Sequence, residues 1–240
     1  LAATQGMEFI EICCNYDEDA QKLIAAQDDV KAQIARTGID VSCVGRWNHH
    51  VQHDGAIDAE NAQLYYDLLD TAIALGAKTF VCGCNYSRYR NYTNAIALFR
   101  GLIDHAAGRT KIAIQNCNWN NFVVSPHDWD VVLGELPELM IKYDASHAYN
   151  RGEDYLAQLS DYGERVAHVH IKGTTHAGKR HVDDPPAGMD DLNWPSQFAI
   201  LYARGYDGDL SIEPHSGAWI GERGDAGVRF TRDFIRKFMV

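Results

Sequence analysis

Seven short apolar runs alternate with amphipathic stretches along the chain. Five of them are rich in Val, Ile or Phe and carry charges only at their ends, which is typical of strands covered on both faces. The runs are Glu8–Cys13, Val41–Val44, Thr79–Cys82, Lys111–Gln115, Met140–Asp144, Val166–Ile171 and Leu210–Glu213. Measured near Cys43, Cys82, Gln115, Asp144 and Ile171, the C-terminal ends of five runs recur every 27 to 39 residues. Because a strand and its helix together need roughly 30 residues, we predict a series of βα units.

Start and stop signals place helices between these strands. Asp17 and Asp58 are expected to cap helix N-termini, and Ser125 stands before a proline at a first helical position. Gly38 and Gly163 follow helical stretches, where a left-handed residue commonly ends a helix. Strict alternation of strands and helices leaves two architectures, a doubly wound sheet or a closed (β/α)₈ barrel.

The turn after the first strand favours the barrel. It reads Cys13-Cys14-Asn15-Tyr16, without the glycines that bind dinucleotide phosphates. We therefore predict an α/β fold, a (β/α)₈ TIM barrel formed by residues 1–240 as one domain. Seven strands are counted where a barrel has eight, and Leu1–Gly6 resembles the end of a helix. We expect the first strand to lie upstream of Leu1, so that the chain is truncated at its N-terminus.

Composition narrows the classes of function. The chain has 240 residues, of which 46% are hydrophobic, and a formal net charge of −11. This acidic balance argues against nucleic-acid binding, and the absence of an apolar run of about 18 residues argues against a membrane span. The six cysteines contain no Cys-x-x-Cys pair, so we expect reduced packing thiols in a cytoplasmic protein. A homo-oligomer is compatible with the sequence.

Polar residues that could bind a metal stand where apolar strands end. Gln115, Asp144 and Glu213 close three of the runs, His170 lies near the end of a fourth, and His147 follows Asp144 by three residues. In a barrel these ends converge on one face, where the active sites of this fold are built. Carboxylate oxygens with one imidazole suit Mn²⁺, Mg²⁺, Co²⁺ or a catalytic Zn²⁺. Such an ion could hold two oxygens of a hydroxy-ketone and acidify the neighbouring C–H bond.

Each residue taken alone has a simpler interpretation. An acidic residue at a strand end, such as Asp144, is commonly a helix cap. A histidine within a strand, such as His168, is commonly a hydrogen-bonded core residue. Four polar strand ends in an otherwise apolar barrel together predict a metal site.

Four segments resemble a known family. They are Gly6–Ile12, Tyr143-Asp144-Ala145-Ser146-His147, His168-Val169-His170-Ile171-Lys172 and Gly205–His215. The chain resembles the xylose isomerase-like TIM barrels, the sugar phosphate isomerase/epimerase superfamily. This superfamily also contains tagatose/psicose 3-epimerases, inosose dehydratase and endonuclease IV. The resemblance covers nearly the whole chain, and the ordered Asp-x-x-His, His-x-His and Ile-Glu-Pro motifs are fairly specific to the superfamily.

The resemblance implies a ligand set for a divalent metal. The family holds its ion with a Glu, an Asp, a His and a second Glu, and the last three fall on Asp144, His170 and Glu213. The first Glu falls on Gln115, which is a departure from the family pattern. A glutamine can donate its carbonyl oxygen to a metal but cannot act as a base. His147 matches the family histidine that contacts substrate hydroxyls.

The implied function is a metal-dependent isomerase or epimerase of a small sugar or keto-polyol. Because Gln115 removes one of two bases, a one-base reaction fits best, either aldose–ketose isomerisation or elimination of water by a dehydratase-like lyase. Glu213 is the candidate base, and His147 or Lys172 is the candidate proton donor. A non-catalytic sugar-binding or partner subunit is one alternative. A nuclease like endonuclease IV is another, which His181 favours and the acidic charge opposes.

Further polar and aromatic residues could contact a carbohydrate, although surface packing explains His50 and Trp119 equally well and a solvated loop charge explains Arg180 equally well. These candidates are Glu11, His50, Trp119 and Arg180. Arg180 belongs to the long segment Gly173–Asn193, which we expect to be an irregular lid or binding loop.

Overall fold

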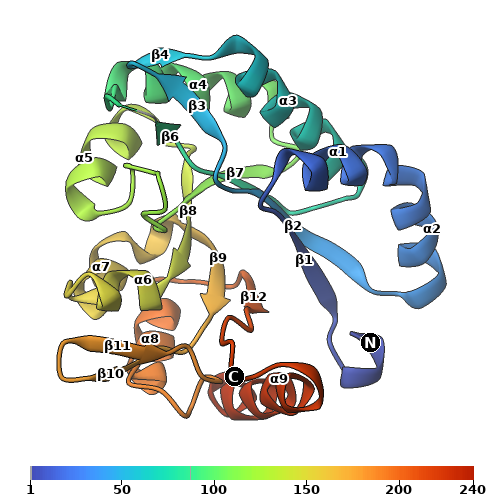
Figure 1. Ribbon diagram of the computed structural model, residues 1–240, viewed down its shortest axis with the longest axis vertical. Helices are drawn as coiled ribbons and strands as arrows, with labels where there is room; N and C mark the ends of the chain where they lie inside the picture. The colour runs from blue at the N-terminus through green and yellow to red at the C-terminus, as the bar shows by residue number, and fades with distance from the viewer. Residues whose placement is uncertain (1, 87) are drawn as a thin grey trace. The chain divides into compact units, whose positions relative to one another are not determined.

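The computed structural model describes residues 2–86 and 88–240, and the chain divides into two compact units, Leu1–Lys142 and Tyr143–Val240 (Figure 1). The predicted end of a helix at Leu1–Gly6 is a single 3₁₀ turn, Ala3–Gln5, closed by a left-handed Gly6. Leu1 itself lies outside the described residues.

The first unit contains a parallel sheet with strand order β1-β2-β5-β7-β8. The strands are β1 (Phe9–Cys14), β2 (Asp40–Arg46), β5 (Thr79–Cys82), β7 (Lys111–Gln115) and β8 (Met140–Asp144), whose end enters the second unit. All five coincide with predicted strands to within a few residues. A small sheet with order β4-β3-β6, which was not predicted, is made of β3 (His50–His53), β4 (Ala56–Ile57) and β6 (Asn85–Tyr86).

Helices follow the strands of the first unit in the predicted alternation. They are α1 (Asp17–Ala25), α2 (Gln27–Thr37), α3 (Ala59–Ala74), α4 (Tyr92–Ala106) and α5 (Pro126–Glu135). The predicted cap Asp58 accepts a hydrogen bond from the Asn61 backbone N–H at 2.9 Å, and Ser125 caps α5. The cap assigned to Asp17 was wrong. Tyr16 is the N-cap of α1, and the Asp17 carboxylate instead pairs with buried Arg46.

The core of the first unit includes small side chains on adjacent strands. Cys43, Val81 and Ala113 are fully buried in one cluster, on β2, β5 and β7. Of the six free cysteines, four are buried, as expected of packing thiols, whereas Cys13 is exposed and Cys117 is partly exposed.

The second unit pairs β9 (Val166–Ile171) in parallel with β12 (Asp209–Ile212). Its helices are α6 (Ala145–Asn150), α7 (Tyr155–Tyr162), α8 (Trp194–Ala203) and α9 (Gly221–Ile235). Gly163 has a right-handed backbone, so its predicted left-handed conformation was wrong, whereas Gly38 has φ of 68° as predicted.

The segment Gly173–Asn193 is not one irregular loop. It contains an antiparallel hairpin of β10 (Thr175–Ala177) and β11 (Arg180–Asp183), joined by a left-handed Gly178. The prediction missed the hairpin because its two strands are short and mostly polar, without the apolar alternation that marks a half-buried strand.

Among the described residues, no helix combines the length and apolar character that a membrane crossing requires.

Candidate metal centre

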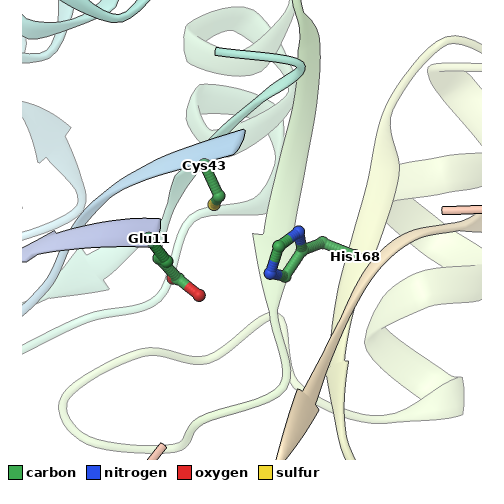
Figure 2. A group of neighbouring side chains, drawn as sticks. All are labelled: Glu11, Cys43 and His168. Atoms are coloured by element: carbon green, nitrogen blue, oxygen red, sulfur yellow. The ribbon is translucent and has the colours of Figure 1, made fainter. Parts of the chain in front are cut away.

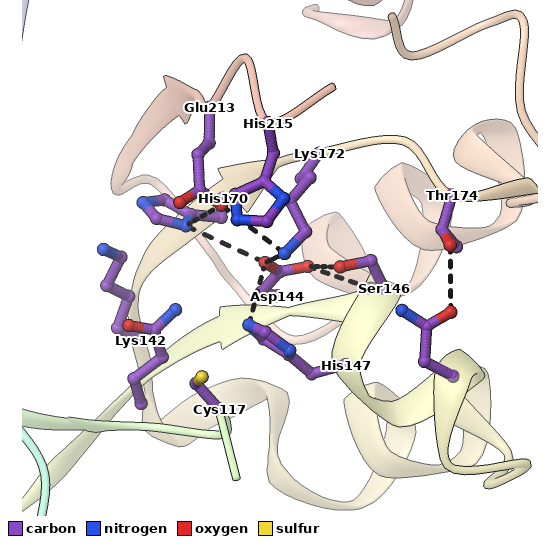
Figure 3. A network of polar contacts seen from close by, with 12 residues as sticks. Cys117, Lys142, Asp144, Ser146, His147, His170, Lys172, Thr174, Glu213 and His215 are labelled. Atoms are coloured by element: carbon purple, nitrogen blue, oxygen red, sulfur yellow. Dashed lines mark hydrogen bonds and ion pairs between the residues drawn. The ribbon is translucent and has the colours of Figure 1, made fainter. Parts of the chain in front are cut away.

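Asp144 stands at a junction of two elements, as the last residue of β8 and the N-cap of α6. Its Oδ1 atom accepts hydrogen bonds from the Ser146 backbone N–H at 2.9 Å and the Ser146 hydroxyl at 2.6 Å. Its Oδ2 atom faces Lys172, His147 and His170 (Figure 3). The helix-cap interpretation and the metal-ligand interpretation therefore concern different oxygens of one carboxylate.

His170 and Glu213 complete a group of three ligands within the second unit. His170 Nδ1 lies 3.3 Å from Glu213 Oε2 and 3.8 Å from Asp144 Oδ2, and one ligand atom from each residue lies within 4.8 Å of the others. The register of β9 and β12 causes this proximity, because Ser211 pairs with His170 and Glu213 follows two residues later.

The donor set fits a divalent cation. Carboxylate oxygens and imidazole nitrogens bind such ions at about 2.0–2.2 Å, so ligand atoms around one ion lie roughly 3–4 Å apart. The separations of 3.3 and 3.8 Å from His170 Nδ1 agree with this requirement. Two carboxylates and one imidazole also leave coordination positions open for a substrate.

Two basic side chains adjoin the ligand group. Lys172 Nζ lies 3.5 Å from Asp144 Oδ2 and 3.7 Å from Glu213 Oε2, and His147 Nε2 lies 3.4 Å from Asp144 Oδ2. Lys172 directly follows β9, two residues after His170. The structure thus brings together five of the predicted site residues.

The carboxylates of this group are held in their charged forms. Burial would raise the pKa of Asp144, but Lys172 and His147 outweigh it and hold that pKa well below its usual range. Burial would also raise the pKa of Glu213, but His170 and Lys172 lower it to about 2. The two side chains differ in access, because Glu213 is 31% exposed and Asp144 is fully buried. Glu213 is therefore the carboxylate that can reach a ligand.

His147 is neutral at physiological pH. Burial lowers its pKa to about 4, more strongly than the neighbouring Asp144 raises it. A neutral imidazole can donate a hydrogen bond to a substrate hydroxyl but does not carry a spare proton. Of the two candidate proton donors, the geometry and charge favour Lys172.

His168 has the simpler role considered for it. Its Nε2 atom lies 2.6 Å from the Ser211 hydroxyl, and the whole residue is buried. This hydrogen bond joins β9 to β12 two residues before His170 along β9.

An outer pair of contacts, which the sequence analysis missed, centres on Asp184. Its two oxygens lie 2.8 Å from His181 Nε2 and 2.9 Å from His215 Nδ1. Burial would raise the pKa of Asp184, but these two hydrogen bonds lower it to about 2 and raise that of His215. Asp184 therefore ties the end of the hairpin to the loop that follows Glu213. The sequence signal was weak, an acid before Pro185 in a polar segment.

Four other predicted residues are described by their places within their own units. Arg180 is exposed at the start of β11 in the second unit. Gln115 is buried at the end of β7 in the first unit, with its backbone carbonyl accepting a hydrogen bond from Asn121 at 3.1 Å. His50 is half-buried at the start of β3, and Trp119 is 48% exposed. Their substrate contacts, and the fourth ligand at Gln115, stay predictions.

Glu11 has a partner within the first unit. Its carboxylate forms an ion pair with the Lys142 ammonium, and both side chains are almost fully buried. Figure 2 shows Glu11 on β1 beside Cys43, its register partner on β2. The burial and the ion pair give Glu11 a clear structural role in its own unit.

Alternating strands and helices, with ligands gathered at strand ends, define a TIM-barrel protein with a candidate metal centre. The chain belongs to the family of xylose isomerase-like TIM barrels, whose sequence profile matches residues 1–238. The family and the α/β fold class predicted from the sequence are thereby confirmed, with seven parallel strands among the described residues.

Solved structures share the fold at low sequence identity. The 3-keto-D-glucoside 4-epimerase YcjR from E. coli is 18% identical, with a TM-score of 0.74 over 98% of this chain and 90% of that one. D-Psicose 3-epimerase from Clostridium cellulolyticum H10, solved with D-tagatose, is 15% identical, with a TM-score of 0.77 over 99% and 91%. IolI, solved with a bound zinc atom, is 14% identical, with a TM-score of 0.78 over 99% and 91%. No curated protein sequence matches this chain.

Proposed function

We propose that the protein is a metal-dependent enzyme that isomerises or epimerises a small sugar or keto-polyol by removing a proton next to a carbonyl group. The observation that carries this proposal is the convergence of Asp144, His170 and Glu213 within ion-binding distance of one another. Membership of the xylose isomerase-like family supports it, and so does the resemblance in fold to two sugar epimerases. The proposal includes a small carbohydrate as the substrate. The exclusion of nucleic acid and the cytoplasmic location stay predictions.

The ligand group would hold Mn²⁺, Mg²⁺, Co²⁺ or Zn²⁺, and the zinc in IolI supports this part of the proposal. A bound divalent ion would polarise a carbonyl oxygen and make the adjacent C–H bond acidic. Asp144, His170 and Glu213 provide two negative charges and one imidazole for this purpose. Gln115 is proposed as a fourth, neutral ligand.

Glu213 is the proposed base. Its carboxylate is charged at neutral pH and partly exposed, so an oxygen can accept the proton that leaves the substrate carbon. Lys172 can give its proton to the oxygen on which the electron pair gathers. In an isomerisation, Glu213 returns the proton to the neighbouring carbon, and the hydroxyl on the first carbon returns a proton to Lys172 as the new carbonyl forms. In an elimination, Glu213 gives its proton to the leaving hydroxyl, which departs as water, and the first oxygen returns its proton to Lys172.

A one-base reaction agrees with the carboxylates of the second unit. Asp144 is fully buried, with one oxygen held by Ser146, and Asp184 is occupied by two histidines. Neither is placed to serve as a second base. Aldose–ketose isomerisation therefore fits better than a two-base epimerisation, and a dehydratase-like elimination uses the same groups.

The direct test is exchange of substrate hydrogen with solvent. We expect the protein loaded with Mn²⁺ to incorporate deuterium from heavy water into a keto-sugar, with D-tagatose, D-psicose and a 3-keto-glucoside as first probes. A chelator should abolish exchange. Glu213→Gln should lower it by about 10²- to 10⁴-fold, the usual contribution of a general base. Mass spectrometry measures the incorporated deuterium.

The matched control is Glu222→Gln, which removes the same charge from an exposed position at the start of α9. It should exchange like the wild type. Full exchange by Glu213→Gln with metal still bound would refute the base assignment. Metal binding without exchange or turnover of any keto-sugar would favour the non-catalytic sugar-binding alternative.

A further inference from the structure

Lys172 places its ammonium group against the two carboxylates that would hold a metal ion. We propose that Lys172 is an internal cation that neutralises Asp144 and Glu213 in the metal-free protein, and that a divalent ion displaces it. This inference rests on the proposed metal centre. It assigns Lys172 a role before substrate arrives, separate from proton donation.

The geometry gives both cations the same two oxygens. Lys172 Nζ lies 3.5 Å from Asp144 Oδ2 and 3.7 Å from Glu213 Oε2. These oxygens, together with His170 Nδ1, are the atoms that form the ligand group. An ion bound at about 2.0–2.2 Å from each oxygen would lie against the ammonium group. The two cations therefore compete for one position.

The charge balance explains why the position needs a cation. Asp144 and Glu213 together carry two negative charges, and Lys172 supplies a positive charge beside both. Close carboxylates without a counter-ion would repel each other, and the full burial of Asp144 strengthens this repulsion. A divalent ion would neutralise both carboxylates, and a neighbouring ammonium would then be repelled.

The lysine can move without a change in the backbone. Lys172 directly follows the last residue of β9, and its side chain is an unbranched stem with a compact charge. Ion binding would release the ammonium from both carboxylates toward the space where substrate oxygens bind. The same group would thus hold the empty site together and later face the substrate.

The test is the affinity for Mn²⁺ alone, measured by titration calorimetry without substrate. We expect Lys172→Met to bind Mn²⁺ at least about tenfold more tightly than the wild type, equivalent to about 1.4 kcal/mol. The metal-free variant should also unfold at a lower temperature than the wild type. Lys179→Met is the matched control, because it removes a lysine charge from the exposed turn of the hairpin. Its Mn²⁺ affinity should equal that of the wild type.

The outcomes separate this inference from the proposed function. Unchanged or weaker Mn²⁺ binding by Lys172→Met, with the wild type still binding, would overturn the inference and leave the metal centre intact. Absence of binding by all proteins, with each of the four candidate ions, would remove the metal centre and the inference with it.

A second measurement serves if Lys172→Met does not fold. Crystal structures of the wild type with and without Mn²⁺ should show Lys172 Nζ leaving both carboxylates when the ion binds. An ammonium still within ion-pair distance of both oxygens in the loaded protein would overturn the inference.

Discussion

Each unit of the molecule contains a buried lysine paired with acid, and the two arrangements differ in charge balance. In the first unit, Lys142 meets one carboxylate, that of Glu11, and both side chains are almost completely buried. In the second unit, Lys172 meets two carboxylates, those of Asp144 and Glu213, and the latter is partly exposed. The first lysine meets one carboxylate, whereas the second is shared between two carboxylates that also face His170.

This difference separates a structural ion pair from a binding site. Burial alone would lower the pKa of Lys142, but Glu11 outweighs it and the pKa rises above its ordinary value. The ammonium also lies 5.2 Å from the centre of the Trp47 ring, a favourable cation–π distance. The Glu11 carboxylate is already neutralised by Lys142, so an added cation would find no net attraction at this pair. At Asp144 and Glu213 two carboxylates share one lysine, which leaves an attraction for a cation.

The largest expected effect is on the buried ion pair between Lys142 and Glu11. Lys142→Met should lower the free energy of unfolding by about 3–5 kcal/mol, because it leaves the Glu11 carboxylate buried without a counter-ion. Adding Glu11→Gln should restore much of the loss, since no uncompensated charge then remains. Urea denaturation of the two single variants and the double variant measures both effects. A double variant that is no more stable than Lys142→Met would contradict this account.

The pH dependence of stability distinguishes the two groups. Glu213 has a pKa lowered from 4.5 to about 2, so its contribution to stability is complete above pH 4.5. This contribution, about 3 kcal/mol in the metal-free protein, should be lost as pH falls to 2 and below. Lys142 has a raised pKa, so its contribution should be lost only as pH rises above 10.5.

Urea denaturation at a series of pH values gives the free energy of unfolding as a function of pH, with an acid limb below pH 4.5 and an alkaline limb above pH 10.5. Glu213→Gln should flatten the acid limb between pH 4.5 and 2 and leave the alkaline limb unchanged. Lys142→Met should flatten the alkaline limb. If Glu213→Gln keeps the acid slope of the wild type, the carboxylate is not stabilised by its neighbours as described.

The smallest effect on stability is expected from removing the hydrogen bond between the Ser146 hydroxyl and Asp144. Ser146→Ala removes the hydroxyl that donates to Asp144 Oδ1 at 2.6 Å, while the backbone hydrogen bond remains. We expect a loss of about 1 kcal/mol in the free energy of unfolding. Metal affinity should weaken by about tenfold, because the ligand loses part of its orientation. Calorimetry with Mn²⁺ checks this, and unchanged affinity would show that the backbone contact alone orients Asp144.

Much of the fold could be predicted because buried parallel strands leave a strong local signal. Val166–Ile171 and Met140–Asp144 were predicted with their exact bounds, since each is a short run of mainly apolar residues that ends at or just before a charged one. The hairpin β10–β11 and the short strands β3, β4 and β6 carry no such signal, because their pairing depends on contacts distant in sequence.

The candidate site was predictable where a ligand closes a strand, as Asp144 and Glu213 do. The contacts of Asp184 with His181 and His215 were not, because three and 31 residues separate the partners and no periodic pattern links them. At Asp17 the local sequence signal was present but misleading. Its position suited a helix cap, but its carboxylate forms an ion pair with the buried Arg46 guanidinium instead.

The attachment of Asp144 to Ser146 has a consequence for the thermodynamics of ion uptake. One oxygen is anchored at the start of α6, so the rotation of this carboxylate is already frozen when the protein folds. An arriving cation therefore does not have to restrict that side chain, and the entropic penalty of coordination falls mainly on the more exposed Glu213. Selectivity among ions of different radius should accordingly depend on how far Glu213 can shift.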